Sequence, residues 1–410
     1  MKHPDYRHIA QSIRNATEWD DAVPLAFPEE GADVFNLSFR SSTASHLLGQ
    51  ASYRCDVHGK DFPGEPASDG SQDCGIKDNL EFRYPLLRGH APAGDGTRSR
   101  HLIILLHGLN ERSYSKYVPW AHQLWRATGA AVALFPLSFH VNRVEPNWGR
   151  QIKQHEARRQ QVARNENVHG FNSVLSERLD THPERFFWGG LQSYGDVVQL
   201  VKQIRAGQNG QIDPSAQIDL LGYSAGGYLS LGLMLADHEG LFKDSRAVLF
   251  AAGAVLRSTH LSTRFIMDMA CEISLMKLYV RFTQRLATPR LAHWLEGHEE
   301  GRWFRALFGE EAERPALERR LKEIAPRLVA IANSNDEVIP AHAVINTMQG
   351  LHRDTGVRVE TLELGVHEHP FVCPDYLQRD RRFVTEFLDV PVFGAGFEQF
   401  IAAAAGLMKR

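Results

Sequence analysis

The amino-acid sequence predicts an α/β protein in which helices cover both faces of a mostly parallel sheet. From Leu80 onward, short apolar runs alternate with longer amphipathic segments, which is typical of strands followed by helices. Several of these runs are apolar on consecutive residues, as in strands that are buried on both faces. The strands that we expect span residues 81–87, 101–106, 130–135, 217–221, 247–252, 327–332 and 357–364.

Length and composition exclude several classes of protein. The 410 residues, 43% of them hydrophobic, suffice for one large core or two moderate ones, which excludes a disordered or fibrous protein. With 46 Lys and Arg against 49 Asp and Glu, the formal net charge is -3, so we expect no nucleic-acid partner. The apolar runs are far shorter than the about 18–20 residues that cross a bilayer, which predicts no transmembrane segment. Residues 1–21 contain no apolar segment typical of a secretion signal, and we expect a cytoplasmic location.

The chain is expected to form one main domain with additions. Residues 80–410 are predicted to be this domain, and residues 1–79, polar and irregular, to be an N-terminal extension packed on it. Two segments of the domain exceed ordinary connections, at about 142–185 and 255–320. The first is charged and Gln-rich, as a solvated helix would be. The second carries an apolar helical stripe, which either packs on the sheet or forms a lid whose inner face contacts substrate.

The most informative stretch is QIDLLGYSAGGYLS at residues 217–230, where an expected strand runs into Gly222-Tyr223-Ser224-Ala225-Gly226 and a helical pattern follows. In this context G-x-S-x-G indicates a nucleophile elbow, with Ser224 in a strained turn. Small residues at 222, 225 and 226 avoid collisions with neighbouring elements. The helix directs its N-terminal amides at the serine, so the backbone N–H of Ala225 is a predicted oxyanion donor.

A serine nucleophile requires a base, and the base requires an acid that fixes its tautomer. In this arrangement the acid and then the histidine follow the serine along the chain. The expected strand 327–332 leads into a loop that carries Asp336 and Glu337. We predict that Asp336 is the orienting acid, with Glu337 as the alternative; a helix cap or a surface charge is the other interpretation of either residue.

The base is expected in the loop GVHEHPF, residues 365–371, which follows the expected strand 357–364. His367 and His369 are both candidates. We favour His367, because His369 precedes Pro370, which restricts the backbone before it. A metal site at this His-Glu-His sequence is disfavoured, since it lacks the i, i+4 spacing of zinc-binding helices and a third ligand.

A further loop of the site is expected at HGLNERS, residues 107–113, after the expected strand 101–106. A backbone N–H from such a loop completes an oxyanion hole, and Leu109 is the predicted donor. His107 is expected to bond loop backbone, because the histidine that performs chemistry comes last in the chain.

Cysteine usage predicts neither disulfides nor a metal site. Cys55, Cys74, Cys271 and Cys373 are few and dispersed, so we expect free thiols. A set of Cys55, His58 and Cys74 lacks the second cysteine pair that would complete a tetrahedral site. We therefore expect no metal and no cofactor.

Four motifs, HGLN at 107–110, GYSAG at 222–226, DEVIP at 336–340 and GVHEHP at 365–370, resemble those of the α/β-hydrolase superfamily. The resemblance covers about residues 80–390. It implies an eight-stranded, mostly parallel sheet and a triad of Ser224, Asp336 and His367. The loop is not the HGGG type of the hormone-sensitive-lipase branch, and HGLNERS with FPLSFHVNR at 135–143 resembles an uncharacterised bacterial branch.

The function expected from these residues is hydrolysis of a small-molecule carboxylic ester through an acyl-enzyme. The apolar insertion favours a substrate with a hydrophobic part. Amide, peptide or thioester hydrolysis would use the same triad and remains an alternative. A non-catalytic binding protein of the same fold is the alternative from another class. No oligomeric state is predicted.

Overall fold

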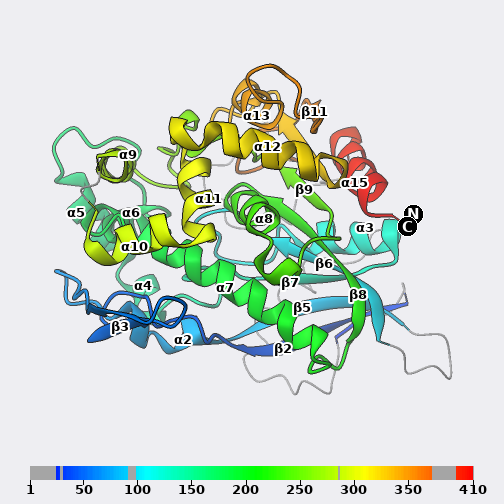
Figure 1. Cartoon of the computed structure of the whole chain (residues 1–410), viewed down its shortest axis with the longest axis horizontal. Coiled ribbons are helices and arrows are strands. Elements are labelled where there is room, and N and C mark those ends of the chain that lie inside the picture. The colour runs from blue at the N-terminus through cyan, green and yellow to red at the C-terminus, as the bar shows by residue number, and fades with distance from the viewer. Residues whose placement is uncertain (1–24, 28–30, 91–97, 285–286, 372–393, 410) are drawn as a thin grey trace.

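The structure is a computed structural model whose centre is a nine-stranded sheet (Figure 1). It describes residues 25–27, 31–90, 98–284, 287–371 and 394–409. Cys373 and residues 1–21, which entered the sequence predictions, lie outside this described part. The strand order is β1-β2-β5-β7-β6-β8-β9-β10-β11, and a separate two-stranded hairpin pairs β3 with β4.

The sheet is mostly parallel, as the sequence predicts. All neighbouring pairs from β7 to β11 are parallel, whereas β1, β2 and β5 pair antiparallel with their neighbours. The three-residue β1 lies at one edge, and the other eight strands make up the body of the sheet. In chain order the strands are β1 (Leu25–Phe27), β2 (Ala32–Arg40), β3 (Ser52–Cys55), β4 (Lys60–Pro63), β5 (Glu81–Gly89), β6 (Ser99–Leu106), β7 (Ala131–Phe135), β8 (Ile212–Tyr223), β9 (Ala247–Phe250), β10 (Leu328–Asn333) and β11 (Arg358–Leu362).

Each of the seven expected strands has a counterpart in the sheet, but β2 was not expected. β2 lies in residues 1–79, which we expected to be irregular. It pairs with β5 along its whole length, from Ala32 opposite Gly89 to Arg40 opposite Glu81. Its sequence, ADVFNLSFR, interrupts the apolar residues with Asp33, Asn36 and Ser38. Such a strand lacks the continuous apolar run by which the central strands are recognised.

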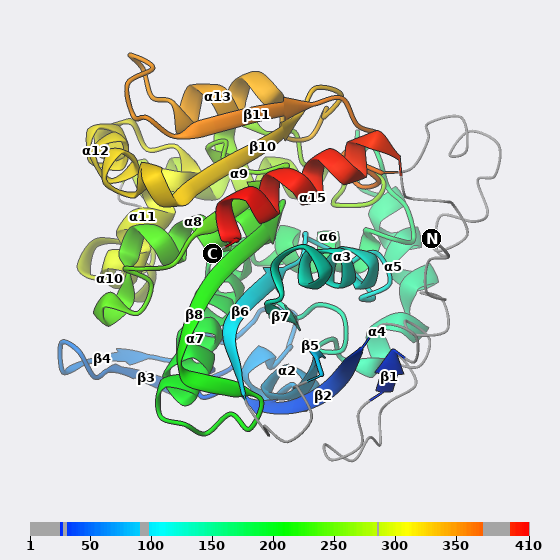
Figure 2. The same ribbon diagram turned by 90° about the vertical axis from the view of Figure 1, so that its right-hand side faces the viewer.

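Helices cover both faces of the sheet, because alternate residues of its strands point to opposite sides. In β6, Ile103 and Leu105 belong to a core with α3 (Val118–Thr128) and α15 (Ala395–Met408). Leu102, Ile104 and Leu106 of the same strand belong to the larger core with α7 (Arg185–Arg205) and α8 (Ala225–Ala236). Figure 2 shows α3 and α15 side by side on the near face of the sheet.

The two segments that the sequence analysis predicts to be insertions are mainly helical. The first contains α4 (Pro146–Arg150), α5 (Ile152–Gln160) and α6 (Ser173–Thr181), and the second contains α9 (Met269–Thr283), α10 (Pro289–Gly297), α11 (Glu299–Phe308) and the start of α12 (Arg314–Ile324). Helices α5, α6, α9 and α10 gather at one end of the molecule in Figure 1. In the described part of the chain the other α-helices are α2 (Lys77–Leu80) and α13 (Ala341–Met348). No helix in the described ranges has the length and apolarity needed to cross a membrane.

Candidate active site

Ser224 occupies a sharp turn between β8, which ends at Tyr223, and α8, which begins at Ala225. Its backbone has φ 53° and ψ -118°, a conformation that residues with a side chain rarely adopt. Strain of this kind persists only where the surrounding structure imposes it, and it occurs frequently at functional sites. The strained turn therefore lies at the position where the sequence analysis predicts a nucleophile elbow.

Two glycines make this turn possible. A Cβ atom on Gly222 would lie 2.2 Å from the carbonyl oxygen of Gly226, and one on Gly226 would lie 2.1 Å from the carbonyl oxygen of Leu106. Both separations are far inside van der Waals contact, and the opposing atoms belong to the backbone. The strand, the turn and the helix can approach one another only without side chains at these two positions.

Ser224, His367 and Asp336 lie in one hydrogen-bonded series. The Nδ1 atom of His367 is 2.7 Å from Oδ2 of Asp336, and Nε2 is 2.9 Å from Oγ of Ser224. When Nδ1 donates to the carboxylate, Nε2 accepts from the serine hydroxyl. All three residues are buried, with Ser224 7% exposed, Asp336 5% and His367 3%. Burial strengthens the electrostatic interactions among them.

The alternatives to Asp336 and His367 are placed differently. Oδ1 of Asp336 accepts from the backbone N–H groups of Val338 at 2.9 Å and Ile339 at 2.7 Å, whereas Glu337 is exposed. The ring of His369 lies edge-on to Phe265, with centroids 5.3 Å apart. Burial holds the pKa of His369 well below its usual value. The structure thus brings Asp336 and His367, rather than their neighbours, to Ser224.

The loop after β6 contributes Leu109 to the site. Leu109 and Ala225 line the same cavity as Ser224. Among the described residues, neither the Leu109 nor the Ala225 backbone N–H has a hydrogen-bond acceptor. Asn110 has a positive φ of 61°, and its side-chain amide donates to the carbonyl oxygens of Phe171 and Phe265. The loop is therefore fixed beside Ser224 with an unused donor.

His107 holds the loop backbone, as expected. Its Nδ1 donates to the carbonyl oxygen of Gly108 at 2.7 Å, and its Nε2 accepts from the N–H of Leu137 at 3.0 Å. Burial lowers the pKa of His107 to about 4. The ring is neutral near pH 7, with both nitrogens used in structural hydrogen bonds.

Two cavities meet at Ser224. One, of about 200 Å³, is mainly apolar and includes Leu191 of α7, Leu229 of α8, and Phe304 and Leu307 of α11. The other, of about 140 Å³, is more polar and includes Lys116 and Glu368 together with His367. Both also contain Leu109. A molecule bound at Ser224 would have an apolar space on one side and a polar space on the other.

A family model with the description "Family of unknown function (DUF6051)" matches residues 6–392. The chain belongs to the DUF6051 family. No curated protein matches it in sequence.

Several solved structures are similar to the DUF6051 chain. Brefeldin A esterase, a bacterial homologue of human hormone-sensitive lipase, is 14% identical with a TM-score of 0.44, and the match covers 98% of this chain and 83% of that one. Carboxyl esterase 2 of the mycorrhizal fungus Tuber melanosporum is 15% identical with a TM-score of 0.41, covering 100% and 99%. An esterase of Pyrobaculum calidifontis is 10% identical with a TM-score of 0.43, covering 100% and 94%.

A polar network that the sequence did not reveal connects the loops of the DUF6051 site. Tyr117 donates from its hydroxyl to Glu111 at 2.7 Å and accepts the N–H of Gly108 at 3.1 Å. Lys116 forms an ion pair with Glu111 and donates to the carbonyl oxygen of Glu368 at 3.1 Å. Its ammonium group also lies 4.6 Å from the ring centre of Tyr223.

Tyr223 continues this network to the base. Its hydroxyl donates to the carbonyl oxygen of His367, and its ring stacks on the imidazole with centroids 5.5 Å apart. The sequence offered one signal for Tyr223, its position directly before Ser224. It offered no comparable signal for Lys116, whose partners include Tyr223 and Glu368, both far away in the sequence. The network joins the backbone of the loop at 108, the elbow and the base loop.

Proposed function

We propose that the chain is a serine hydrolase of the α/β-hydrolase superfamily that cleaves carboxylic esters through an acyl-enzyme. The observation that supports this most directly is the buried hydrogen-bonded series from Asp336 through His367 to Ser224. A nucleophile bonded to a base, which is bonded to an orienting acid, is the arrangement that activates a serine hydroxyl.

The proposed reaction begins when Ser224 Oγ attacks the substrate carbonyl carbon while His367 Nε2 takes its proton. Asp336 fixes the tautomer of His367 and stabilises the imidazolium. The N–H groups of Leu109 and Ala225 donate to the oxyanion. His367 then protonates the leaving alcohol and afterwards removes a proton from the water that attacks the acyl-enzyme, which releases the acid and regenerates Ser224.

The two cavities suggest how the substrate lies. The apolar cavity suits the acyl part, and the polar cavity beside Lys116 and Glu368 suits the alcohol part. The apolar cavity has a volume of about 200 Å³. We propose a small-molecule ester with a short or medium-length hydrophobic acyl group that this cavity can hold.

The insertion at about 255–320 is proposed to act as a cap over the acyl part. Phe304, Leu307 and Phe308 of α11 line the apolar cavity, as does Ile266 from the segment before α9. This agrees with the lid interpretation of the insertion and assigns its inner face to α11 rather than to the longer α9. Leu175 and Arg178 of α6 add a contribution from the first insertion.

The decisive test is Ser224→Ala. A fluorophosphonate is expected to label the wild-type protein and not the Ala variant, and turnover of p-nitrophenyl butyrate should fall by at least about 10³-fold. Ser230→Ala is the matched control, since Ser230 is a buried serine of the same helix whose hydroxyl donates to the carbonyl oxygen of Gly226. Labelling of Ser224→Ala, or an unlabelled folded wild type, would refute the assignment.

A substrate panel tests the ester and its size. Esters of p-nitrophenol with acyl chains from acetate to palmitate should give the highest kcat/KM at short or medium length. Acyl thioesters and aminoacyl anilides are compared at the same concentrations. Turnover of the anilides or thioesters in excess of every ester would replace the ester proposal with the corresponding alternative.

A further inference from the structure

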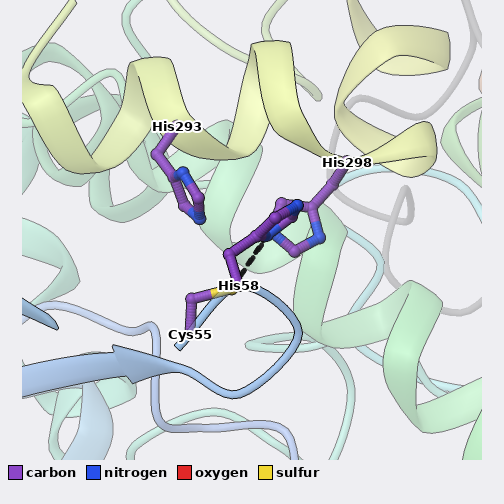
Figure 3. A group of neighbouring side chains, drawn as sticks. All are labelled: Cys55, His58, His293 and His298. Carbon is purple, nitrogen blue, oxygen red and sulfur yellow. Dashed lines mark hydrogen bonds between the residues drawn. The ribbon is translucent and has the colours of Figure 1, made fainter. Parts of the chain in front are cut away.

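Four side chains with metal-binding atoms converge in Figure 3, and none of them lines the two cavities at Ser224. Cys55 ends β3, His58 lies in the turn before β4, His293 lies on α10, and His298 lies between α10 and α11. One ligand atom from each residue lies within 4.8 Å of those of all the others. Figure 3 shows the Cys55 sulfur and the three imidazoles directed toward one another. We propose that these four residues bind one Zn²⁺ ion.

The distances fit a tetrahedral zinc site. Zn–S bonds of about 2.3 Å and Zn–N bonds of about 2.0 Å in tetrahedral geometry place neighbouring ligand atoms about 3.3–3.6 Å apart. The Cys55 sulfur is 3.4 Å from Nδ1 of His58 and 3.4 Å from Nε2 of His298. The three rings meet edge-on, at interplanar angles of 82°, 83° and 86°. Edge-on rings can point their nitrogens at one centre, which stacked rings cannot.

The ligand types select zinc and a structural role. Zn²⁺ is a borderline-soft ion that binds thiolates and imidazoles, such as the one thiolate and three imidazoles here. Four protein ligands fill every position of a tetrahedral Zn²⁺ ion, which is typical of a structural site.

A second observation points to a missing partner at this place. The buried Nε2 atom of His293 has no hydrogen-bond partner within the described part of the chain. A buried polar atom without a partner is destabilising, and bonds to a metal or to ordered water remove that penalty. Nδ1 of His298 lies 3.7 Å from the carboxylate of Glu300, on the side opposite Cys55. A carboxylate near the second nitrogen is common for zinc-bound histidine.

The ion would add a bond between the β3–β4 hairpin and α10, which otherwise meet through aromatic contacts of Tyr53 with Trp294 and of Phe62 with His293. The β3–β4 hairpin has a small core of Tyr53, Cys55 and Phe62, against which Trp294 packs. A two-stranded hairpin is marginally stable by itself. Zinc ligation would attach this hairpin to α10 and to the start of α11.

This attachment reaches the apolar cavity through α11. His298 is the N-cap residue of that helix, and Phe304 and Leu307 follow on it. The Trp294 ring stacks on His298 with centroids 3.9 Å apart, which fixes the turn between α10 and α11. The zinc site thus anchors the end of α11 from which the cavity wall begins, while its existence does not depend on the proposed reaction at Ser224.

The sequence predictions named no metal, and they considered Cys74 together with Cys55 and His58. The structure groups Cys55 and His58 with two histidines instead, and Cys74 is not among the four. The available signals were the C-x2-H spacing of 55–58 and the H-x4-H spacing of 293–298. Each pair alone is common, and only the fold brings them together.

Metal analysis of the purified full-length protein tests the proposal. We expect about one zinc per chain by mass spectrometry of the wild type, and a loss of at least about tenfold in Cys55→Ser and in His298→Ala. Cys74→Ser and His352→Ala are the matched controls, because Cys74 lies outside the four residues and His352 is exposed. Both controls should keep the metal. Equal zinc content in all four variants would overturn the assignment.

Cobalt substitution identifies the ligands without relying on the stability of a variant. The wild type, stripped with a chelator and titrated with Co²⁺ alone, should show the intense visible bands of a tetrahedral ion and a thiolate-to-cobalt band in the near ultraviolet. Cys74→Ser should show both, and a folded Cys55→Ser variant should lose the thiolate band. A weak octahedral spectrum in the wild type, or loss of the band in Cys74→Ser, would refute the site.

Discussion

Asp336 shows how one buried carboxylate is made to orient a histidine. Oδ1 is occupied by two backbone N–H groups of the loop that follows it, and Oδ2 faces His367. The loop therefore holds the carboxylate in one rotamer before any substrate arrives. Hydrogen bonds to the ionised oxygen compensate for the loss of water around a buried charge.

Asp336→Asn is expected to reduce kcat for ester hydrolysis by about 10³–10⁴-fold while the protein stays folded. The amide has the same shape, and its oxygen can keep the two backbone N–H partners. Its NH₂ group, however, would face Nδ1 of His367 and favour the tautomer that cannot accept from Ser224. Kinetics with p-nitrophenyl butyrate and a circular-dichroism melting curve measure both effects.

Glu337→Gln is the control for this prediction, since Glu337 is adjacent in sequence but exposed. It should change kcat by less than about twofold. If the two variants had similar activity, or if Glu337→Gln were the impaired one, Asp336 would not be the orienting acid.

At the scale of elements, the site depends on the close approach of α8 to the neighbouring strands β6 and β8. Gly226, in the first turn of α8, lies against the carbonyl oxygens of Leu106 and His107, at the end of β6. Gly232 lies about 1.7 turns further along the same helix, and a Cβ atom there would meet nothing within 4 Å. The two glycines have the same intrinsic helix propensity but opposite packing environments.

Gly226→Ala is expected to lower the free energy of unfolding by at least about 1–3 kcal/mol, because the backbone must shift to admit the methyl group. Gly232→Ala should raise it by about 0.5–1 kcal/mol, since alanine loses less conformational entropy in a helix interior. Urea denaturation followed by circular dichroism measures both. A neutral or stabilising Gly226→Ala would contradict the close approach of helix and strand.

The sequence predicted those elements whose burial produces a recognisable pattern among neighbouring residues. The run Leu102–Leu106 is apolar on consecutive residues, so a strand covered on both faces was predictable. The elbow, the acid loop and the base loop each follow a strand, so their residues could be named before their distances were known. β2 was missed because Asp33, Asn36 and Ser38 break its apolar pattern, and its stabilisation comes from pairing with β5.

What could not be predicted are contacts between segments far apart in the chain. Glu111, Lys116 and Tyr117 lie in one loop, but Lys116 also contacts the ring of Tyr223 and the carbonyl oxygen of Glu368. No spacing in the sequence relates Lys116 to Glu368. The same holds for Cys55 and His298, which meet only when the hairpin and the second insertion are folded. In the sequence alone, such polar residues cannot be distinguished from exposed surface residues, and only the fold shows that they are buried.

For the whole molecule, buried neutral histidines make stability depend on pH. His107 and His140 are both buried, with ring centroids 5.4 Å apart. Burial lowers the pKa of His107 to about 4 and that of His140 to about 3. In the unfolded chain both would have a pKa of about 6.5. Between pH 6.5 and 4 the unfolded state therefore binds protons that the folded state cannot.

The free energy of unfolding is accordingly expected to fall as the pH falls through this window, by up to about 1.4 kcal/mol per pH unit for each histidine. His140→Asn should reduce this slope by the contribution of about one proton bound on unfolding. The asparagine amide can still donate to the Ser138 carbonyl oxygen, but it does not titrate. The exposed His352→Asn serves as the control and should leave the slope unchanged. Urea denaturation at pH 7.5, 6.0 and 5.0 gives the slopes. If His140→Asn kept the slope of the wild type, proton uptake on unfolding would have to come from groups other than His140.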